Sequence, residues 1–550
     1  MLTPSVYEDG FARDALPPPE LWPLLTDGGL PELSYPERFN AAVELLDGAL
    51  ARGWGDRPCL RAPGLVWSYA EVLERANRVA AVLVKEMGLR SGNRVLLRGA
   101  NNPMMAVCWL AVLKAGGIAV ATMPLLRERE LTYILDKAQV QFALCDKALA
   151  DELAAAQAKS PALGRTIHFN DPGPDGLEAL MARQSGGFRN VIPAQDDVAL
   201  IAFTSGTTGQ AKGTVHFHSD VLAICDCFPR STLKPTPDDI FCGSPPLAFT
   251  FGLGGLLLFP MRFGASTLLL ERCPPAELLQ AVQDHRLSVI FTAPTAYRVM
   301  ADLAQRYDIS SLKKCVSAGE HLPAATFTAW RQASGISIID GIGSTEMLHI
   351  FISSAGDDVR PGATGKAIPG YQAMVVDDEM RPVAPGMVGR LAVRGPTGCR
   401  YLANLEQQRR YVRDGWNLTG DAYRMDEDGY FWYQARTDDM IISAGYNIAG
   451  PEIEAVLLDH PKVKECAVVG TPDRERTEIV KAFVVLRDGN APDEATTREL
   501  QDFVKAQIAP YKYPRAIEYV EALPRTETGK VQRFQLRALE RQRAASAGSD

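Results

Sequence analysis

The 550-residue sequence has no long hydrophobic run, no paired cysteine framework and no excess of positive charge. Its longest apolar stretch, residues 253–261, falls far short of the roughly 20 residues that a membrane-spanning helix needs. Residues 1–14 contain acidic side chains and lack an apolar centre, which is unlike a signal peptide. We therefore expect a cytoplasmic protein with no membrane partner.

Basic side chains do not outnumber acidic ones. The 58 Lys and Arg residues against 66 Asp and Glu give a net charge of -8, which offers no broad attraction to nucleic acid. Any phosphate binding must therefore depend on a local arrangement of groups.

Cysteine is sparse, with ten residues that mostly stand alone, as is typical of reduced core thiols. Cys225 and Cys227 form a Cys-x-Cys pair near His216 and His218. Since no second pair with zinc-finger spacing follows, a metal site there is disfavoured.

Helical and strand patterns alternate along most of the chain. Residues 69–87 carry apolar side chains at helical spacing behind an N-cap candidate, Ser68, and residues 94–97 and 118–121 are typical of buried strands. A similar unit follows, with a helix predicted over 274–285 and a strand over 288–292. The alternation predicts an α/β fold whose large N-terminal domain consists of helix-covered β-sheets.

The pattern changes near residue 436. Segments 375–377, 389–394 and 430–433, separated by glycine and proline, predict a β-rich subdomain. The residues beyond show an α+β pattern, with helices predicted at 451–458 and 497–508 and strands at 465–470 and 480–486. We expect two domains, residues 1–437 and residues 438–550.

The most informative segment is residues 204–213, Thr204-Ser205-Gly206-Thr207-Thr208-Gly209-Gln210-Ala211-Lys212-Gly213. Its glycines let the backbone approach a ligand, its hydroxyls donate hydrogen bonds, and Lys212 supplies positive charge. The composition predicts a phosphate-binding loop, with a plain flexible turn as the alternative. The spacing differs from the Gly-x4-Gly-Lys-Ser/Thr of a Walker loop, which disfavours the common nucleotide hydrolases.

This loop resembles the phosphate loop of the adenylate-forming (acyl-CoA synthetase, AMP-binding) superfamily, and further motifs of that superfamily follow in the expected order. Its adenine- and Mg-binding segments are similar to Ser317-Ala318-Gly319-Glu320 and Asp340-Gly341-Ile342-Gly343-Ser344-Thr345-Glu346. Its ribose-binding pair resembles Thr419-Gly420-Asp421 and Arg436, its hinge segment residues 438–452, and its catalytic-lysine loop residues 524–530. The match spans roughly residues 67–533.

The resemblance implies an ATP-dependent acid:CoA ligase, which forms an acyl-AMP and then transfers the acyl group to coenzyme A, with ATP and Mg²⁺ as further cofactors. It implies that residues 1–437 bind ATP and the acid, while the mobile domain 438–550 carries the catalytic Lys530 and rotates about a hinge at Asp438. The cofactor-binding residues that it implies are Thr204, Ser205, Gly206, Thr207, Thr208, Gly209, Gly319, Glu320, Asp340, Gly341, Asp421, Arg436 and Gly445.

The residue types suit the catalytic roles that the resemblance assigns to Lys530, Lys212, Thr345 and Glu346. A carboxylate and the α-phosphate of ATP are both anionic, so their approach must be offset by positive charge. Lys530 is the best candidate, since a unit charge about 4 Å away is worth ~4 kcal/mol at an effective dielectric of 20. Glu346 can hold Mg²⁺ through oxygen, and the Thr345 hydroxyl can donate to the α-phosphate.

Three positions depart from the superfamily pattern. Ala211 stands where proline is common, Ala435 replaces a glycine before Arg436, and Ser443 replaces a frequent lysine. None removes a charge assigned to adenylation, but the serine removes the support for a CoA contact at that position.

Within the superfamily the chain resembles most closely the benzoate-CoA and 2-aminobenzoate-CoA ligases, through residues 340–353 and 249–254. An aromatic acid needs a flat, apolar pocket with one or two polar groups. The candidate substrate-binding residues are Thr250, Phe251, Gly343, His349 and Ile350. An ortho-amino group needs an acceptor, for which Thr250 and Asp226 are candidates, and the choice between the two acids stays open.

Two further functions share these motifs. One is a ligase for another aryl acid or for a short- or medium-chain acid, and the other is a carrier-protein-loading adenylation enzyme, which the lack of a trailing carrier domain disfavours. A non-enzymatic binding protein is disfavoured by the full set of charged residues that the motifs retain. The oligomeric state is left open between monomer and homodimer.

Overall fold

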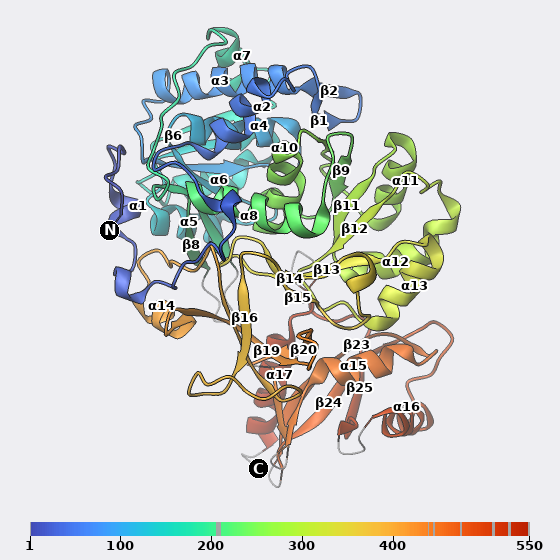
Figure 1. Ribbon diagram of the computed structural model, residues 1–550. Coiled ribbons are helices and arrows are strands. Elements are labelled where there is room, and N and C mark those ends of the chain that lie inside the picture. Colours follow the sequence, from blue (N-terminus) through green and yellow to red (C-terminus); the bar gives the residue numbers. More distant parts are fainter. Residues whose placement is uncertain are drawn as a thin grey trace.

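The computed structural model describes residues 2–204, 211–437, 439–443, 446–473, 476–508, 512–525 and 530–547. Within these residues the strands form four sheets, of six, nine, five and five strands. Figure 1 shows helices packed around the sheets of the larger part, and the orange and red C-terminal elements gathered beyond it.

The six-stranded sheet has the order β6-β5-β3-β4-β7-β8, in which only β8 runs antiparallel to its neighbour. All residues of β3 and of helix α4 are buried, as expected where apolar side chains surround an element on every side. The strands are β3 (Arg94–Arg98), β4 (Ile118–Thr122), β5 (Phe142–Asp146), β6 (Arg165–Phe169), β7 (Val198–Thr204) and β8 (Lys212–Phe217). The helices around them are α3 (Tyr69–Lys85), α4 (Pro103–Lys114), α5 (Glu128–Ala138), α6 (Ala150–Gln157), α7 (Leu177–Ala182) and α8 (His218–Phe228), with the short α1 (Phe11–Asp14) and α2 (Gly48–Ala51).

The nine-stranded sheet has the order β15-β14-β13-β12-β11-β9-β10-β1-β2, and its strands from β1 through β13 along this order are parallel. In parallel sheets ligands bind at the carboxyl ends of the strands, and two predicted motifs lie there: one begins at the last residue of β12, and the other starts within β13 and continues beyond its end. The strands are β1 (Pro58–Ala62), β2 (Leu65–Ser68), β9 (Ile240–Gly243), β10 (Ser266–Leu268), β11 (Val289–Thr292), β12 (Lys314–Ser317), β13 (Ile338–Gly343), β14 (Ile350–Ser353) and β15 (Lys366–Ala367). The helices are α9 (Thr250–Leu253), α10 (Phe259–Arg262), α11 (Pro275–His285), α12 (Pro294–Leu303) and α13 (Ala324–Ser334).

Two smaller sheets complete the molecule. The first contains β16 (Gln372–Val376), β17 (Val388–Arg394), β18 (Val412–Arg413), β19 (Trp416–Met425) and β20 (Phe431–Arg436), with helix α14 (Leu405–Tyr411). The second contains β21 (Ile441–Ser443), β22 (Tyr446–Ile448), β23 (Val463–Asp473), β24 (Thr477–Leu486) and β25 (Ala516–Tyr519), with helices α15 (Gly450–Asp459), α16 (Glu494–Gln507) and α17 (Arg533–Ala547).

The predicted fold class is confirmed, since helix-covered sheets and a β-rich region are followed by a small α+β part. The boundary at residues 437/438 stays a prediction, and Asp438 lies outside the described residues. None of the helices in the described ranges is long and apolar enough to cross a bilayer. The ten cysteines are free thiols, and the described part of the chain holds no His/Cys/Asp/Glu cluster suited to a metal ion.

Helix α3 begins with a capping box that the sequence predicts in part. The Ser68 hydroxyl accepts a hydrogen bond from the Glu71 N–H at 3.2 Å, and the Glu71 carboxylate accepts one from the Ser68 N–H at 2.8 Å. Ser68→Ala should lower the free energy of unfolding of the larger part by about 1 kcal/mol, measured by urea denaturation. Ser68→Asp keeps a capping acceptor and is the control. An alanine variant as stable as the parent would show that the cap contributes nothing.

Candidate active site

The predicted catalytic lysine lies beside the segment that follows β12. A Cβ atom on Gly319 would lie 3.7 Å from the Lys530 Cε atom and 3.8 Å from its Nζ atom. Gly319 has a φ of +92°, a conformation that glycine adopts at little cost. The fold therefore brings together two segments that lie far apart in the sequence.

Charged groups of both signs surround this lysine. The Lys530 residue as a whole is exposed, yet desolvation of its ammonium end lowers its pKa, and the carboxylates of Glu320 and Asp421 oppose that change. Burial in turn raises the pKa of Glu320, and the charge of Lys530 opposes it. The lysine is thus placed among the segments predicted to bind the nucleotide.

The predicted ribose-binding pair is formed by two neighbouring strands. Asp421 on β19 lies directly opposite Arg436 on β20, and the Arg436 Nη1 donates to the Asp421 Oδ1 at 3.1 Å. Between them Gly420 has a φ of +78°, and a Cβ atom there would lie 2.6 Å from the Arg436 Nη2. Only glycine at this position lets the guanidinium approach so closely.

Asp340 lies buried on β13 with an unused acceptor. Burial raises its pKa to about 8, although the Ser317 hydroxyl and the Gly341 N–H partly oppose the change. Within the described ranges its Oδ1 has no hydrogen-bond partner of ordinary geometry. An amine donor such as the exocyclic amino group of adenine fits this position.

Glu346 follows β13, where two other segments hold it and its neighbour. The Tyr401 hydroxyl donates to the Glu346 Oε1 at 2.6 Å, and the His216 Nε2 donates to the Thr345 carbonyl at 2.7 Å. Leu348 has a φ of +69°, which is uncommon for a bulky side chain and marks backbone strain beside the site.

The phosphate loop joins β7 to β8. Thr204 ends β7 and pairs with Lys212, the first residue of β8, so the two lie side by side at the loop end of a hairpin. The other predicted loop residues lie outside the described part of the chain, as do the predicted hinge and the predicted CoA segment glycine: Ser205, Gly206, Thr207, Thr208, Gly209, Asp438 and Gly445.

Aromatic side chains surround His349. Its ring lies 4.5 Å from that of Phe259, 5.7 Å from Phe251 and 5.8 Å from Phe228. Gly343 pairs with Ile350 between β13 and β14, and a Cβ atom on that glycine would lie 2.7 Å from the His349 backbone carbonyl. The structure therefore brings Phe251, Gly343, His349 and Ile350 together, four of the five predicted substrate residues.

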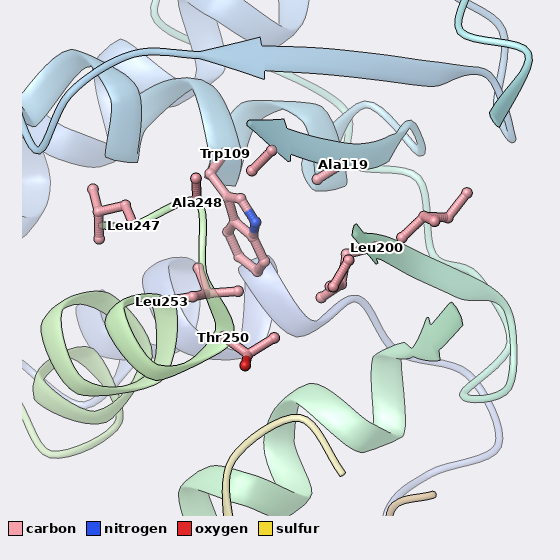
Figure 2. A pocket seen from close by; sticks show the side chains of 10 residues that line it. Trp109, Ala119, Leu200, Leu247, Ala248, Thr250 and Leu253 are labelled. Carbon is pink, nitrogen blue, oxygen red and sulfur yellow. The ribbon is translucent and has the colours of Figure 1, made fainter. Parts of the chain in front are cut away.

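The fifth, Thr250, begins α9 and lines an apolar hollow with Trp109, Ala248 and Leu253 (Figure 2). The hollow encloses about 10 Å³, which is at most the room for one water molecule and excludes an aromatic ring. Thr250 is thus placed beside the aromatic cluster, next to Phe251, with its side chain in this hollow.

The interpretation of Asp226 as an acceptor for a substrate amino group is corrected by the structure. Its carboxylate accepts from the Tyr35 hydroxyl at 2.9 Å, from Arg230 at 2.7 Å and from Arg262 at 2.8 Å. Both carboxylate oxygens are therefore occupied, as is usual for a buried charge.

His349 is buried and electrically neutral. Burial lowers its pKa to about 3, although the nearby Phe251 backbone partly opposes the change. Neither ring nitrogen has a hydrogen-bond partner of ordinary geometry among the residues that the structure describes. A neutral imidazole offers one donor and one acceptor, so this site can bind a polar substituent on an otherwise apolar ligand.

Comparison with known proteins agrees with this arrangement. The model of the AMP-binding enzyme family matches residues 49–401, and that of the AMP-binding enzyme C-terminal domain matches residues 452–530. The chain belongs to the AMP-binding enzyme family. It is an AMP-forming CoA ligase, and the cofactors of this class are ATP, Mg²⁺ and coenzyme A.

Individual members of the family are similar over nearly their whole length. A benzoate–CoA ligase of Thauera aromatica is 35% identical over 514 residues, which cover 92% of this chain and 97% of that protein. A 3-hydroxybenzoate–CoA ligase of Aromatoleum sp. (strain CIB) is 30% identical, covering 91% and 97%. The crystal structure of the anthranilate CoA ligase AuaEII with anthranoyl-AMP has a TM-score of 0.88 and 34% identity, covering 94% and 100%. The predicted superfamily is confirmed.

The residues present fit the cofactors of an AMP-binding enzyme. The unpartnered Asp340 Oδ1 suits the adenine amine, and the Asp421 carboxylate suits ribose hydroxyls. Glu346 offers the carboxylate oxygen that Mg²⁺ prefers, and the ion would supply charge neutralisation at the phosphates.

The sequence did not point to Tyr401 as a neighbour of the site, nor to His216 except as a disfavoured metal ligand. Tyr401 lies 55 positions from Glu346 and contacts it only through the pairing of distant segments. No local pattern carries this information, because the apolar neighbours of a buried tyrosine look like any core segment.

Lys530→Ala should reduce acid-dependent ATP–pyrophosphate exchange by about 10²–10³-fold, since the variant lacks the cation that offsets two approaching anions. Lys462→Ala removes a lysine that pairs with Glu499 on the surface of the C-terminal part, and it is the matched control. An undiminished exchange rate for Lys530→Ala would contradict the assigned role.

Proposed function

We propose that this protein is an aryl-CoA ligase that converts an aromatic carboxylic acid, 2-aminobenzoate in preference to benzoate, into its acyl-AMP and then into aryl-CoA, AMP and pyrophosphate. The neutral imidazole of His349 lies within an aromatic cluster, and among the described residues its ring nitrogens have no hydrogen-bond partner of ordinary geometry; this observation carries the choice of acid.

The walls of the cluster favour a short, flat acid. Phe228 and Phe259 are buried and Phe251 is half-buried, and their rings pack around one imidazole. Gly254 packs against the same imidazole so closely that a Cβ atom there would lie 2.4 Å from the His349 Cδ2. Such a densely packed end favours an aromatic ring over a long flexible chain.

The unused ring nitrogens distinguish between aromatic acids. A buried polar group without a partner costs about 1–3 kcal/mol, so a ligand that supplies the partner recovers that free energy. The amino group of 2-aminobenzoate is a donor for the acceptor nitrogen of His349, whereas benzoate has no group for it. The similarity to an anthranilate CoA ligase supports the same choice.

The charged groups divide the adenylation step between them. Lys530 would offset the charge of the acid carboxylate and the α-phosphate, while Thr345 would donate its hydroxyl to that phosphate. Glu346 would hold Mg²⁺, and Asp421 would accept from the ribose hydroxyls. Thioester formation would then need the lysine to withdraw, through rotation of the C-terminal part about Asp438.

Omission of CoA separates the candidate functions. Without CoA, 2-aminobenzoate should cause the release of about one pyrophosphate per enzyme, because the acyl-AMP stays bound until a thiol attacks it. Addition of CoA should restore turnover and produce the thioester, detected by chromatography. Pyrophosphate release without any thioester would indicate a carrier-protein-loading enzyme, and no release would indicate a binding protein.

His349→Phe should lower kcat/KM for 2-aminobenzoate about tenfold relative to kcat/KM for benzoate. The substitution removes a hydrogen bond to the amino group, which only 2-aminobenzoate has. His349→Gln keeps polar atoms and should lose less. Thr250→Ala tests whether Thr250, and not His349, distinguishes the two acids. In this variant the ratio of kcat/KM for 2-aminobenzoate to kcat/KM for benzoate should stay near the parent value. If this ratio changes in Thr250→Ala and stays unchanged in His349→Phe, Thr250 is the residue that distinguishes the acids and the assignment is wrong.

A further inference from the structure

The Glu346 carboxylate is held by a buried tyrosine. The Tyr401 hydroxyl donates to the Glu346 Oε1 at 2.6 Å, a short bond of the kind formed with a charged acceptor. Tyr401 is 1% exposed, and its own N–H donates to the Gln408 side chain at 2.9 Å. Within the described residues no other group bonds to this carboxylate. One of its two oxygens therefore already accepts a hydrogen bond, and the other is the less restrained of the two.

Arg400, the residue before Tyr401, belongs to a series of contacts that restrains the backbone of Thr345. The Thr345 carbonyl can only accept, so the His216 Nε2 that lies 2.7 Å away carries the proton. The His216 Nδ1 faces Asp220 at 3.5 Å, and Asp220 pairs with Arg400 at 2.9 Å. Arg400 and Tyr401 thus restrain the backbone of Thr345 and the side chain of Glu346 together.

We propose that Tyr401 is a positioning residue that leaves a single oxygen of Glu346 for the divalent cation and thereby favours Mg²⁺ over Ca²⁺. The proposal rests on the ATP-dependent reaction of the proposed function and is independent of which acid is the substrate.

The two cations differ in what they require of a carboxylate. Mg²⁺ is small and demands near-octahedral geometry, which favours one oxygen from each carboxylate, whereas Ca²⁺ accepts six to eight oxygens and can bind a carboxylate through one oxygen or through both. With Tyr401 in place, Glu346 presents its second oxygen alone, which suits Mg²⁺. Without the phenol, both oxygens become accessible to a larger cation.

The phenol stays a donor throughout the working pH range. Burial and the charge of Glu346 both raise the pKa of Tyr401 far above its ordinary value. The hydrogen bond therefore does not depend on a titration near neutral pH, and its effect on the cation comes from geometry.

The test is the dissociation constant of ATP, measured by calorimetry without acid or CoA, in Mg²⁺ and then in Ca²⁺. Tyr401→Phe should weaken binding in Mg²⁺ about tenfold and leave binding in Ca²⁺ unchanged or tighter. Tyr69→Phe is the control, because it also removes a buried phenol, whose hydroxyl donates to the Ala265 carbonyl at 2.7 Å, without touching Glu346. In this control variant, the ratio of the ATP dissociation constants in Mg²⁺ and in Ca²⁺ should equal that of the parent.

The proposal would be overturned if Tyr401→Phe weakened ATP binding equally in Mg²⁺ and in Ca²⁺. It would also be overturned if the variant lowered Tm and left the ratio of the two dissociation constants unchanged. Glu346→Gln provides a second variant that does not alter the tyrosine. Its amide oxygen keeps the bond to Tyr401 and its NH₂ group cannot bind the cation, so it must lose the preference for Mg²⁺, and a retained preference would also overturn the proposal. Absence of ATP binding by the unaltered protein would instead refute the proposed function.

Discussion

Two negatively charged reactants must be brought into contact, and the arrangement of the site follows from that constraint. The cation proposed to offset them, Lys530, comes from the C-terminal part, and the segment beside it follows a strand of the nine-stranded sheet. Lys530 lies beside Gly319, where the charges of Glu320 and Asp421 act on its ammonium group. In the proposed reaction the lysine can act only while the two parts of the chain are together, which would make their contact part of the chemistry.

Parallel strands explain why motifs spread over much of the sequence meet. Their carboxyl ends lie at one edge of the nine-stranded sheet, so the segments after β12 and β13 open onto the same region. The β-rich sheet adds the ribose pair by placing Asp421 and Arg436 opposite each other on adjacent antiparallel strands. One hydrophobic core joins the two large sheets and the β-rich sheet, so the packing that stabilises the fold also fixes these segments relative to one another.

Much of this could be predicted from the sequence where the relevant interaction is local or belongs to a motif. Helix α3 with its cap, and the Asp421–Arg436 pair, follow from such patterns. The interactions of Asp226 did not, because Tyr35 and Arg262 reach it from remote segments and occupy both oxygens. The same holds for Tyr401, whose bond to Glu346 depends on how the β-rich region packs on the larger sheet.

The turn after β13 carries both the proposed Mg²⁺ ligand and the imidazole proposed to contact the acid. Glu346, the strained Leu348 and His349 lie within four residues, so these two groups share one short backbone segment. Tyr401 and His216 restrain one end of that segment, and the aromatic rings restrain the other. The strain at Leu348 persists because contacts on both sides over-determine the turn. On the proposed function, metal binding and recognition of the acid would therefore both depend on the packing around this one turn.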